Sequence, residues 1–291
     1  MSRDAADINR SIFNEEAASY DEKHRKLHER LTRELQARLD FIGVDWASDD
    51  EDSDEEERGG NSKEPRREVR LLDYACGTGM MSRALAPYVT QCVGMDISEK
   101  MIAAYNTQAE NQGLSHDEMH AILGDLTSET VDDALASPEL FNFDIAVVGG
   151  GFHHFGDPEL AAKRLVERLK PNGVLLIWDF LPHGPPHRHH DHAERDGEEG
   201  GHDVYRSVMH HGFSEPRMRE IFAAAGAGAG FSLELVGGGF VLGGHGQPKR
   251  EEGQRGHASG DCGGDDGRGD KGDQEAFRRR VFFARGTKGA V

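Results

Sequence analysis

Two patterns of apolar and polar positions alternate along this chain. Near the N-terminus, leucines recur every fourth residue at Leu27, Leu31, Leu35 and Leu39, which predicts an amphipathic helix. Beyond residue 68, short apolar runs bounded by polar residues or glycine predict buried strands. The predicted strands are 69–74, 89–95, 119–123, 143–149, 174–178, 231–236 and 280–285.

Helix signals separate most of these strands. Ser98 stands where an N-terminal cap is expected, Asp157 precedes Pro158 at a typical helix start, and Gly226 closes the last helix. The predicted helices begin near 80 and at 98, 157 and 214, and the last three end near 113, 170 and 225. Strands and helices that alternate in this way predict a parallel sheet with helices on both faces.

The expected fold class is therefore α/β, with a doubly wound, mostly parallel seven-stranded sheet. No helix separates the last two strands, so we expect an antiparallel last strand. Ligands of such sheets bind beyond the carboxyl ends of the strands, where the strand order reverses.

Three polar tracts interrupt the pattern, and none can bury enough apolar surface to offset its ordering entropy. We therefore predict a single domain with disordered insertions. The domain plan assigns 1–45 to an N-terminal helical cap, 46–68 to an acidic insertion, 69–180 to the ligand-binding core, 181–213 to a His-rich lid or insertion, 214–242 to a core helix and strand, 243–275 to a Gly/Asp-rich insertion, and 276–291 to the last strand and tail.

Composition narrows the class of protein. The formal net charge of −19 argues against a nucleic-acid partner, because phosphate binding needs a basic face. Cys76, Cys92 and Cys262 form no Cys-x-x-Cys pair, so neither a disulfide framework nor a zinc site is supported. The start of the chain lacks a signal-peptide core, and no apolar run is long enough to span a membrane. We expect a soluble, cytoplasmic protein and leave a nuclear location open.

A histidine cluster lies in the second polar tract, at His187, His189, His190 and His192. Such tracts bind Ni²⁺ or Cu²⁺ weakly, but this one has no fixed geometry. We therefore expect no defined metal site there.

The sequence DYACGTG, which begins at Asp73, places two glycines between a strand and a helix. A dinucleotide fingerprint needs a third glycine where Ser82 stands, so a nicotinamide dinucleotide loses support. Asp96 closes the next strand, where a carboxylate can bind both hydroxyls of a ribose.

With these residues in view, the chain resembles the class I S-adenosylmethionine-dependent methyltransferases, in particular the small-molecule branch typified by ubiquinone/menaquinone methyltransferases. The motifs that carry the resemblance are FNEEAASYDE (13–22), DYACGTG (73–79), GMDIS (94–98), GDL (124–126), FHHF (152–155) and LKPNG (169–173). One departure is Ala75, where the family usually has glycine.

The resemblance implies a Rossmann-like methyltransferase fold, S-adenosyl-L-methionine as cofactor and S-adenosyl-L-homocysteine as product. The glycine loop would bind the methionine carboxylate, with Asp73 receiving the ammonium group directly or through water. Asp96 would hold the ribose, Ile97 and Leu126 would flank the adenine, and Asp125 would accept from its amine. The implied cofactor-binding residues are Tyr20, Asp73, Ala75, Cys76, Gly77, Thr78, Gly79, Asp96, Ile97, Met101, Gly124, Asp125, Leu126, Gly149 and Gly150.

Two histidines after the fourth strand, His153 and His154, are the catalytic candidates. A base is needed only if the methyl acceptor is a hydroxyl or an acidic carbon, and a histidine with a near-neutral pKa suits that role. The alternative is that both shape the pocket by hydrogen bonding. His210 and His211 are further candidates to line the pocket.

We therefore expect an enzyme that transfers a methyl group to O, N, S or C of a small molecule by in-line displacement. The chain has Gly149-Gly150-Gly151-Phe152 where amino-methylating nucleic-acid and glutamine methyltransferases have Asp/Asn-Pro-Pro-Tyr, which argues against those classes. The alternatives are a noncatalytic methyltransferase-fold partner protein and, more remotely, a nicotinamide oxidoreductase. The sequence leaves the acceptor and the oligomeric state open.

Overall fold

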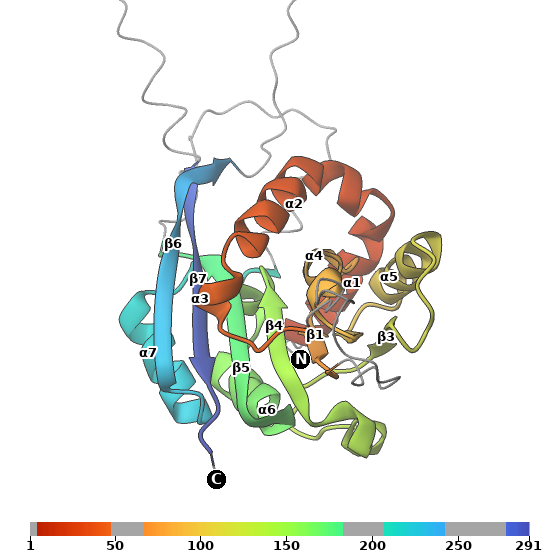
Figure 1. The fold of residues 1–291 in the computed structure, drawn as a ribbon. Coiled ribbons are helices and arrows are strands. Elements are labelled where there is room, and N and C mark those ends of the chain that lie inside the picture. Colours follow the sequence, from red (N-terminus) through yellow and green to blue (C-terminus); the bar gives the residue numbers. More distant parts are fainter. Residues whose placement is uncertain (1–4, 48–66, 183–206, 242–277, 291) are drawn as a thin grey trace, which may run out of the picture.

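A seven-stranded sheet forms the centre of the molecule (Figure 1). The computed structural model describes residues 5–47, 67–182, 207–241 and 278–290. The strand order is β3-β2-β1-β4-β5-β7-β6, and β7 runs antiparallel to both of its neighbours. The strands are β1 Arg70–Tyr74, β2 Gln91–Asp96, β3 Met119–Leu123, β4 Phe143–Gly149, β5 Leu169–Phe180, β6 Ala229–Val241 and β7 Arg278–Thr287. The predicted fold class is confirmed, including the antiparallel last strand.

Helices cover both faces of this sheet (Figure 1). They are α1 Ala5–Glu16, α2 Tyr20–Gln36, α3 Leu39–Ile42, α4 Met80–Leu85, α5 Glu99–Asn111, α6 Pro158–Arg168 and α7 Glu215–Ala225. The predicted caps are confirmed, because the side chains of Ser98, Asp157 and Ser214 each accept a hydrogen bond from a backbone N–H in the first turn. Gly226 closes α7 with a φ of 87°, a left-handed conformation that glycine adopts readily.

The central strands bury both of their faces, which explains their continuous apolar runs. Leu71 of β1 and Leu176 of β5 pack with α2, α4 and α5 on one face. Leu72 and Leu175 alternate with them and pack with α6 and α7 on the other face. Each such fully buried leucine contributes about 2 kcal/mol of hydrophobic stabilisation. The two-sided core therefore holds the strand ends that carry the candidate site.

The N-terminal region contains more helix than its leucine pattern predicts. Besides α2, it forms α1, a 3₁₀ turn at Ala17–Ser19, and the short helix α3. Only Asn9 and Ile12 of α1 are buried, so this helix has too few apolar positions for periodicity to mark it. The predicted helix corresponds to α2, with Leu39 at the start of α3.

Strand β5 begins at Leu169, earlier than the predicted residue 174. Leu169 pairs with Phe143, the register then shifts, and regular pairing resumes between Val174 and Ile145. Asn172 adopts a φ of 64°, which allows the Lys-Pro-Asn-Gly run to bulge within the strand instead of ending it. Strands β6 and β7 are also longer than predicted, because their ladder continues to Val241 and Arg278.

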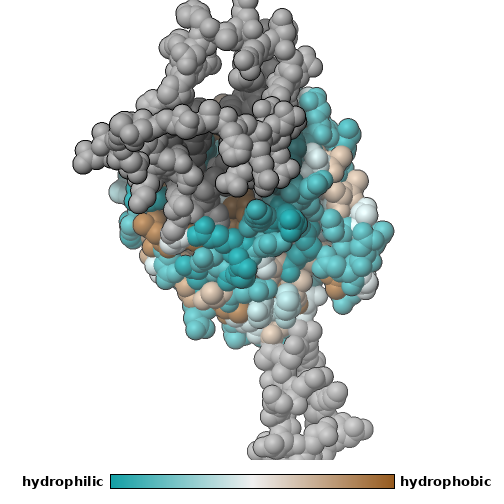
Figure 2. Space-filling view, turned by 90° about the horizontal axis from the view of Figure 1, so that it is seen from above, coloured by the Kyte–Doolittle hydropathy of each residue, from teal (hydrophilic) through white to brown (hydrophobic). Residues whose placement is uncertain are grey.

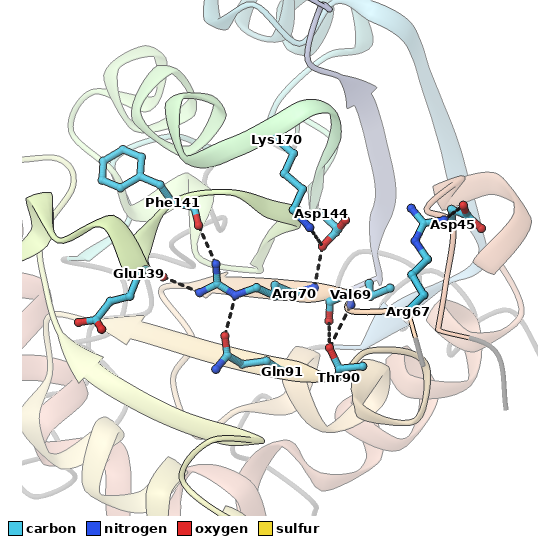
Figure 3. Close-up of polar contacts among 10 residues, drawn as sticks. All are labelled: Asp45, Arg67, Val69, Arg70, Thr90, Gln91, Glu139, Phe141, Asp144 and Lys170. Carbon is cyan, nitrogen blue, oxygen red and sulfur yellow. Dashed lines mark hydrogen bonds and ion pairs between the residues drawn. The ribbon is translucent and has the colours of Figure 1, made fainter. Parts of the chain in front are cut away.

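Polar contacts join the amino ends of the four neighbouring strands β2, β1, β4 and β5 (Figure 3). The guanidinium of Arg70 in β1 donates to the side chain of Gln91 in β2 and to the backbone carbonyl of Phe141 before β4. Asp144 in β4 accepts from the Arg70 backbone N–H and from Lys170 Nζ, each at 2.8 Å. Since these strands are parallel, this end lies opposite the carboxyl edge, where the glycine loop follows β1.

Where Figure 2 exposes described residues, the surface is mainly hydrophilic with scattered apolar atoms. The large apolar side chains that are about half exposed, Leu123, Met209 and Leu235, come from separate parts of the chain. Among the described helices, none is long and apolar enough to cross a membrane. Most of each predicted insertion lies outside the described residues. The histidine cluster and Cys262 lie there as well.

Candidate functional site

A cavity of about 300 Å³ opens where the strand order reverses, between the carboxyl ends of β1 and β4. The loops after β1, β2, β3 and β4 line it, together with α1 and the start of α2. The predicted residues that line it are Tyr20, Ala75, Gly77, Asp96, Ile97, Met101, Asp125, Gly149, Gly150 and His154. The predicted residues outside this lining are Asp73, Cys76, Thr78, Gly79, Gly124, Leu126 and His153.

The Asp96 carboxylate is held between two loops. Its Oδ2 accepts from the backbone N–H of Gly77 at 2.8 Å, and its Oδ1 accepts from that of Ser98 at 2.9 Å. The residue is 7% exposed, and burial raises its pKa above the ordinary value. The two carboxylate oxygens together offer about four lone-pair sites, so the carboxylate keeps acceptor capacity for a hydroxyl on a ligand in the cavity. This arrangement fits the ribose of the cofactor that the sequence implies.

Asp73 lies behind the glycine loop. Its Oδ2 accepts from both the backbone N–H and the hydroxyl of Ser82, at 3.0 and 2.7 Å, so it holds the first turn of α4. Its Oδ1 is buried without a hydrogen-bond partner in the described structure. Burial raises the pKa of Asp73 to about 7. The position provides no direct contact with the cavity, so the predicted role toward the ammonium group stays a prediction.

Three residues of the glycine loop, Cys76, Thr78 and Gly79, lie behind the cavity lining. The Thr78 hydroxyl donates to Asp21 of α2 at 2.5 Å, and Gly79 has no room for a Cβ beside the Tyr105 ring. Burial raises the pKa of the Cys76 thiol well above its ordinary value, so this cysteine is a poor nucleophile. These residues position the loop without lining the cavity.

Two glycines at the end of β4, Gly149 and Gly150, line the cavity opposite the glycine loop. A Cβ on Gly149 would meet the Met81 side chain at 2.5 Å, and a Cβ on Gly150 would overlap the Trp178 ring. Gly150 also adopts a φ of 70°, which a larger residue would adopt only with strain. The glycines therefore let the Met81 and Trp178 side chains pack directly against the backbone that lines the cavity.

At the end of β3, Asp125 lines the cavity, and its Oδ1 accepts from the backbone N–H and the hydroxyl of Thr127. This is ordinary turn chemistry, and it leaves Oδ2 available. Leu126 is fully buried, and its backbone N–H donates to the Tyr74 hydroxyl at 3.0 Å. Gly124 lines a neighbouring cavity of about 360 Å³, which shares Ile97 and Asp125 with the first.

The adjacent histidines differ in their surroundings. His154 lines the cavity, and its Nδ1 lies 2.9 Å from the carbonyl oxygen of Ser207, so Nδ1 carries the proton and Nε2 is left as an acceptor. Burial lowers the pKa of His154 to about 3, so its ring is neutral at physiological pH. The Nδ1 of His153 lies 3.0 Å from Oδ1 of the buried Asp179, outside the cavity lining. His210 and His211 also lie outside that lining.

The predicted helical cap includes α1, but the predicted site residues include none from this helix. Asn9 and Phe13, four residues apart on one face of this helix, line the cavity. Asn9 Nδ2 donates to the carbonyl oxygen of His154 at 2.9 Å, and the Phe13 ring meets the His154 ring edge to face. The i, i+4 spacing was the available signal, but nothing local shows that this face turns toward the site. The other lining residues absent from the predicted set are Ala5, Ala6, Tyr74, Thr127, Ser128, Glu129, Gly151, Phe155, Gly156 and Asp157.

Comparison with known proteins shows matches to one family. A family model described as a methyltransferase domain matches residues 24–228. The chain is 30% identical over 149 residues to an uncharacterized methyltransferase of Schizosaccharomyces pombe, covering 51% of this chain and 49% of that protein. It is 31% identical over 121 residues to a ubiquinone biosynthesis O-methyltransferase of Caulobacter sp., covering 42% and 44%. It is 35% identical over 121 residues to a demethylmenaquinone methyltransferase of Thermus thermophilus, covering 40% and 49%. The chain thus spans about half the length of these curated relatives.

A solved structure supports the fold. A complex of the Haloferax volcanii Trm112 methyltransferase activator with a methyltransferase contains a chain that matches with a TM-score of 0.56 and 15% identity. The match covers 95% of this chain and 97% of that chain. At this identity the likeness shows the shared fold alone.

Proposed function

Because the chain belongs to the class I S-adenosylmethionine-dependent methyltransferases, we propose that it transfers a methyl group to a small-molecule acceptor at O, N, S or C. The observation that carries this proposal is the Asp96 carboxylate. It lines the same cavity as the glycine loop and His154, and it keeps acceptor capacity beyond its bonds to the backbone. This shared cavity supports a site where the ribose would be bound close to the reacting centre.

The residues that would hold S-adenosylmethionine come from three loops. Asp96 would bind the ribose hydroxyls, and the backbone at Gly77 would meet the amino-acid end. Ile97 and Met101 provide an apolar wall, and Asp125 offers an unused carboxylate oxygen for the adenine amine. When bound, the cofactor supplies an electrophilic methyl group whose leaving group needs no acid.

The chain's own residues would orient the acceptor and exclude water. Phe13, Tyr20 and Phe155 close the cavity with aromatic rings. Since the pKa of His154 is lowered to about 3, we assign its Nε2 the role of accepting a hydrogen bond from the acceptor, which aligns the reacting lone pair. His153, held by Asp179, packs against His154 with ring centroids 4.1 Å apart and positions it.

The net charge of the chain and the residues that line the cavity both support a small-molecule acceptor. The chain carries a net charge of −19, and among the described residues no lysine or arginine lines the cavity. A nucleic-acid acceptor needs cationic contacts to its phosphates. The relatives named for ubiquinone and menaquinone methylation point in the same direction.

A screen with methyl-labelled S-adenosylmethionine tests this function. Hydroxyl, amine, thiol and quinone-like acceptors would be incubated with the protein and with Asp96→Ala as a matched control. Label should enter at least one small molecule with the unaltered protein and fall strongly with the variant. If the protein bound no S-adenosylhomocysteine and labelled no acceptor, it would be a noncatalytic partner protein.

A further inference from the structure

A second cavity, of about 360 Å³, adjoins the proposed cofactor cavity. The two cavities share four lining residues, which are Ala6, Ile97, Asp125 and Ser128. These residues come from α1 and from the loops after β2 and β3, so three segments of the chain form the boundary. The second cavity therefore continues the first.

Asp125 stands at this boundary with an oxygen to spare. Its Oδ1 accepts from the backbone N–H and the hydroxyl of Thr127, at 2.7 and 2.6 Å, which leaves Oδ2 for a ligand. In the proposed function, this oxygen accepts from the adenine amine. Asp96, which would hold the ribose, lines the first cavity and not the second. Because the amine lies on the side of the adenine ring away from the ribose, the ring would place its amine at the entrance to the second cavity.

The adenine amine carries two hydrogens, and the bond to Asp125 needs one of them. The other can be replaced by a carbon substituent while the first hydrogen bond is kept. Since Asp125 lines both cavities, a substituent on the amine would extend into the second cavity.

The lining of the second cavity suits an apolar group. Leu123 and Leu135 line it beside the shared Ile97. Leu123 is 49% exposed, so a ligand that covers it removes apolar surface from water. An apolar cavity of about 150 Å³ holds benzene, so the larger volume here can hold a ring and the carbon that links it to the amine.

Helix α1 forms one wall of the second cavity and is fixed in place. Arg10 lines the cavity and forms an ion pair with Glu99 at the start of α5. One turn further on, Asn14 Oδ1 accepts from the Ser98 hydroxyl at 2.7 Å and from the Lys100 backbone N–H at 3.1 Å. These contacts hold the wall against the loop that carries Ile97, so the second cavity is a formed site.

We infer that the cofactor site extends past the adenine into this second cavity, and that the protein binds adenosyl ligands that carry an apolar substituent on the adenine amine. This inference rests on the proposed methyltransferase function and adds a binding subsite to it. Asp125 accepts from the N–H that remains, and Leu123 and Leu135 cover the substituent.

Calorimetric titration with S-adenosylhomocysteine and three of its derivatives tests the inference. The N6-benzyl derivative keeps one N–H and buries apolar surface, so it should bind at least as tightly as S-adenosylhomocysteine itself. The N6-benzyl-N6-methyl derivative has no N–H on the amine, and the 8-benzylamino derivative carries the ring on the side of the ribose. Each of these two should bind at least about tenfold more weakly than the N6-benzyl derivative.

A cavity-filling variant locates the substituent. Ala134 lines the second cavity and not the first, so Ala134→Phe fills the proposed subsite. It should lower the affinity for the N6-benzyl derivative relative to S-adenosylhomocysteine by at least about tenfold. The control Ala136→Phe places the same residue at an exposed position of the same 3₁₀ turn, outside both linings, and should leave this ratio unchanged.

The comparison among ligands uses the unaltered protein, so it holds even if Ala134→Phe does not fold. Binding of the N6-benzyl derivative more than about threefold weaker than that of S-adenosylhomocysteine would overturn the inference. So would tighter binding of either other derivative than expected, or an unchanged ratio in Ala134→Phe that still binds S-adenosylhomocysteine. Failure of the unaltered protein to bind S-adenosylhomocysteine would instead overturn the proposed function, so the two failures are distinguishable.

Discussion

At residue 75, the glycine loop adopts a left-handed backbone with a φ of 54°, although the residue is alanine. The left-handed region places the Cβ of an L-residue too close to the following carbonyl oxygen. Glycine adopts this region without that contact, so alanine is an unfavourable residue at position 75. The alanine keeps the loop geometry at a cost in stability.

Ala75→Gly should therefore stabilise the protein, by about 1 kcal/mol, because the strain it relieves exceeds the entropy that glycine adds to the unfolded chain. Chemical unfolding measures this change. Ala103→Gly, at an exposed helical position in α5, is the control and should destabilise by about 1 kcal/mol. A loss of stability with Ala75→Gly would show that the loop does not hold this conformation.

The free energy of unfolding should depend on pH through the titration of Asp73. Its pKa is raised from 3.8 to about 7, mainly by burial. The folded state thus keeps a proton that the unfolded state loses. The stabilising contribution is complete below pH 3.8 and is lost as the pH rises to about 7.

Asp73→Asn removes this titration while keeping the shape of the side chain. In cofactor-free protein, the stability of the variant relative to the original should rise between pH 4 and pH 7.5, by up to about 4 kcal/mol. Urea unfolding at both pH values measures the difference. A constant difference would mean that Asp73 titrates normally in the folded protein.

At the scale of elements, α2 is tied to the loop that it covers. Asp21 in its first turn accepts from the Thr78 hydroxyl at 2.5 Å through Oδ1, and from Gln108 of α5 at 3.0 Å through Oδ2. Tyr20, the preceding residue, lines the cavity. Asp21 therefore joins the N-terminal cap to the glycine loop and to α5.

Asp21→Ala should speed the dissociation of S-adenosylhomocysteine by about tenfold or more, because hydrogen bonds to a charged group are worth about 1.5–3 kcal/mol. Stopped-flow displacement measures this rate. Glu22→Ala alters the exposed neighbouring carboxylate and should leave the rate as it was. Equal rates for both variants would show that the cap does not control release.

The sequence predicts the elements best where local signals dominate. Buried strands such as β1 and β4 show continuous apolar runs, and the caps at Ser98 and Asp157 have local hydrogen-bonding chemistry. Helix α1 lies within the helical cap predicted for residues 1–45, but the position of Asn9 could not be predicted, because Asn9 contacts a residue 145 positions away in the chain. The bulged start of β5 depends on its pairing with β4, which is also nonlocal.

At the scale of the whole molecule, the topology brings the site together. The loops after β1 and β4 diverge at the point where the strand order reverses, and the cavity opens between them. Residues as distant in sequence as Asn9, Asp96 and His154 meet there. The motif order in the sequence predicted which loops would converge, and residues such as Asp96 and Asp125 line the cavity, whereas others such as Asp73 and Cys76 lie behind it.

The central claim is that this cavity binds the cofactor through Asp96, and calorimetric titration with S-adenosylhomocysteine tests it most directly. We predict saturable binding at one site, weakened by about 1–3 kcal/mol in Asp96→Ala because the ribose hydroxyls lose their acceptors. Asp117→Ala, at an exposed carboxylate before β3, should bind as the original protein does. No binding by the original protein, or equal affinity in Asp96→Ala, would contradict the account.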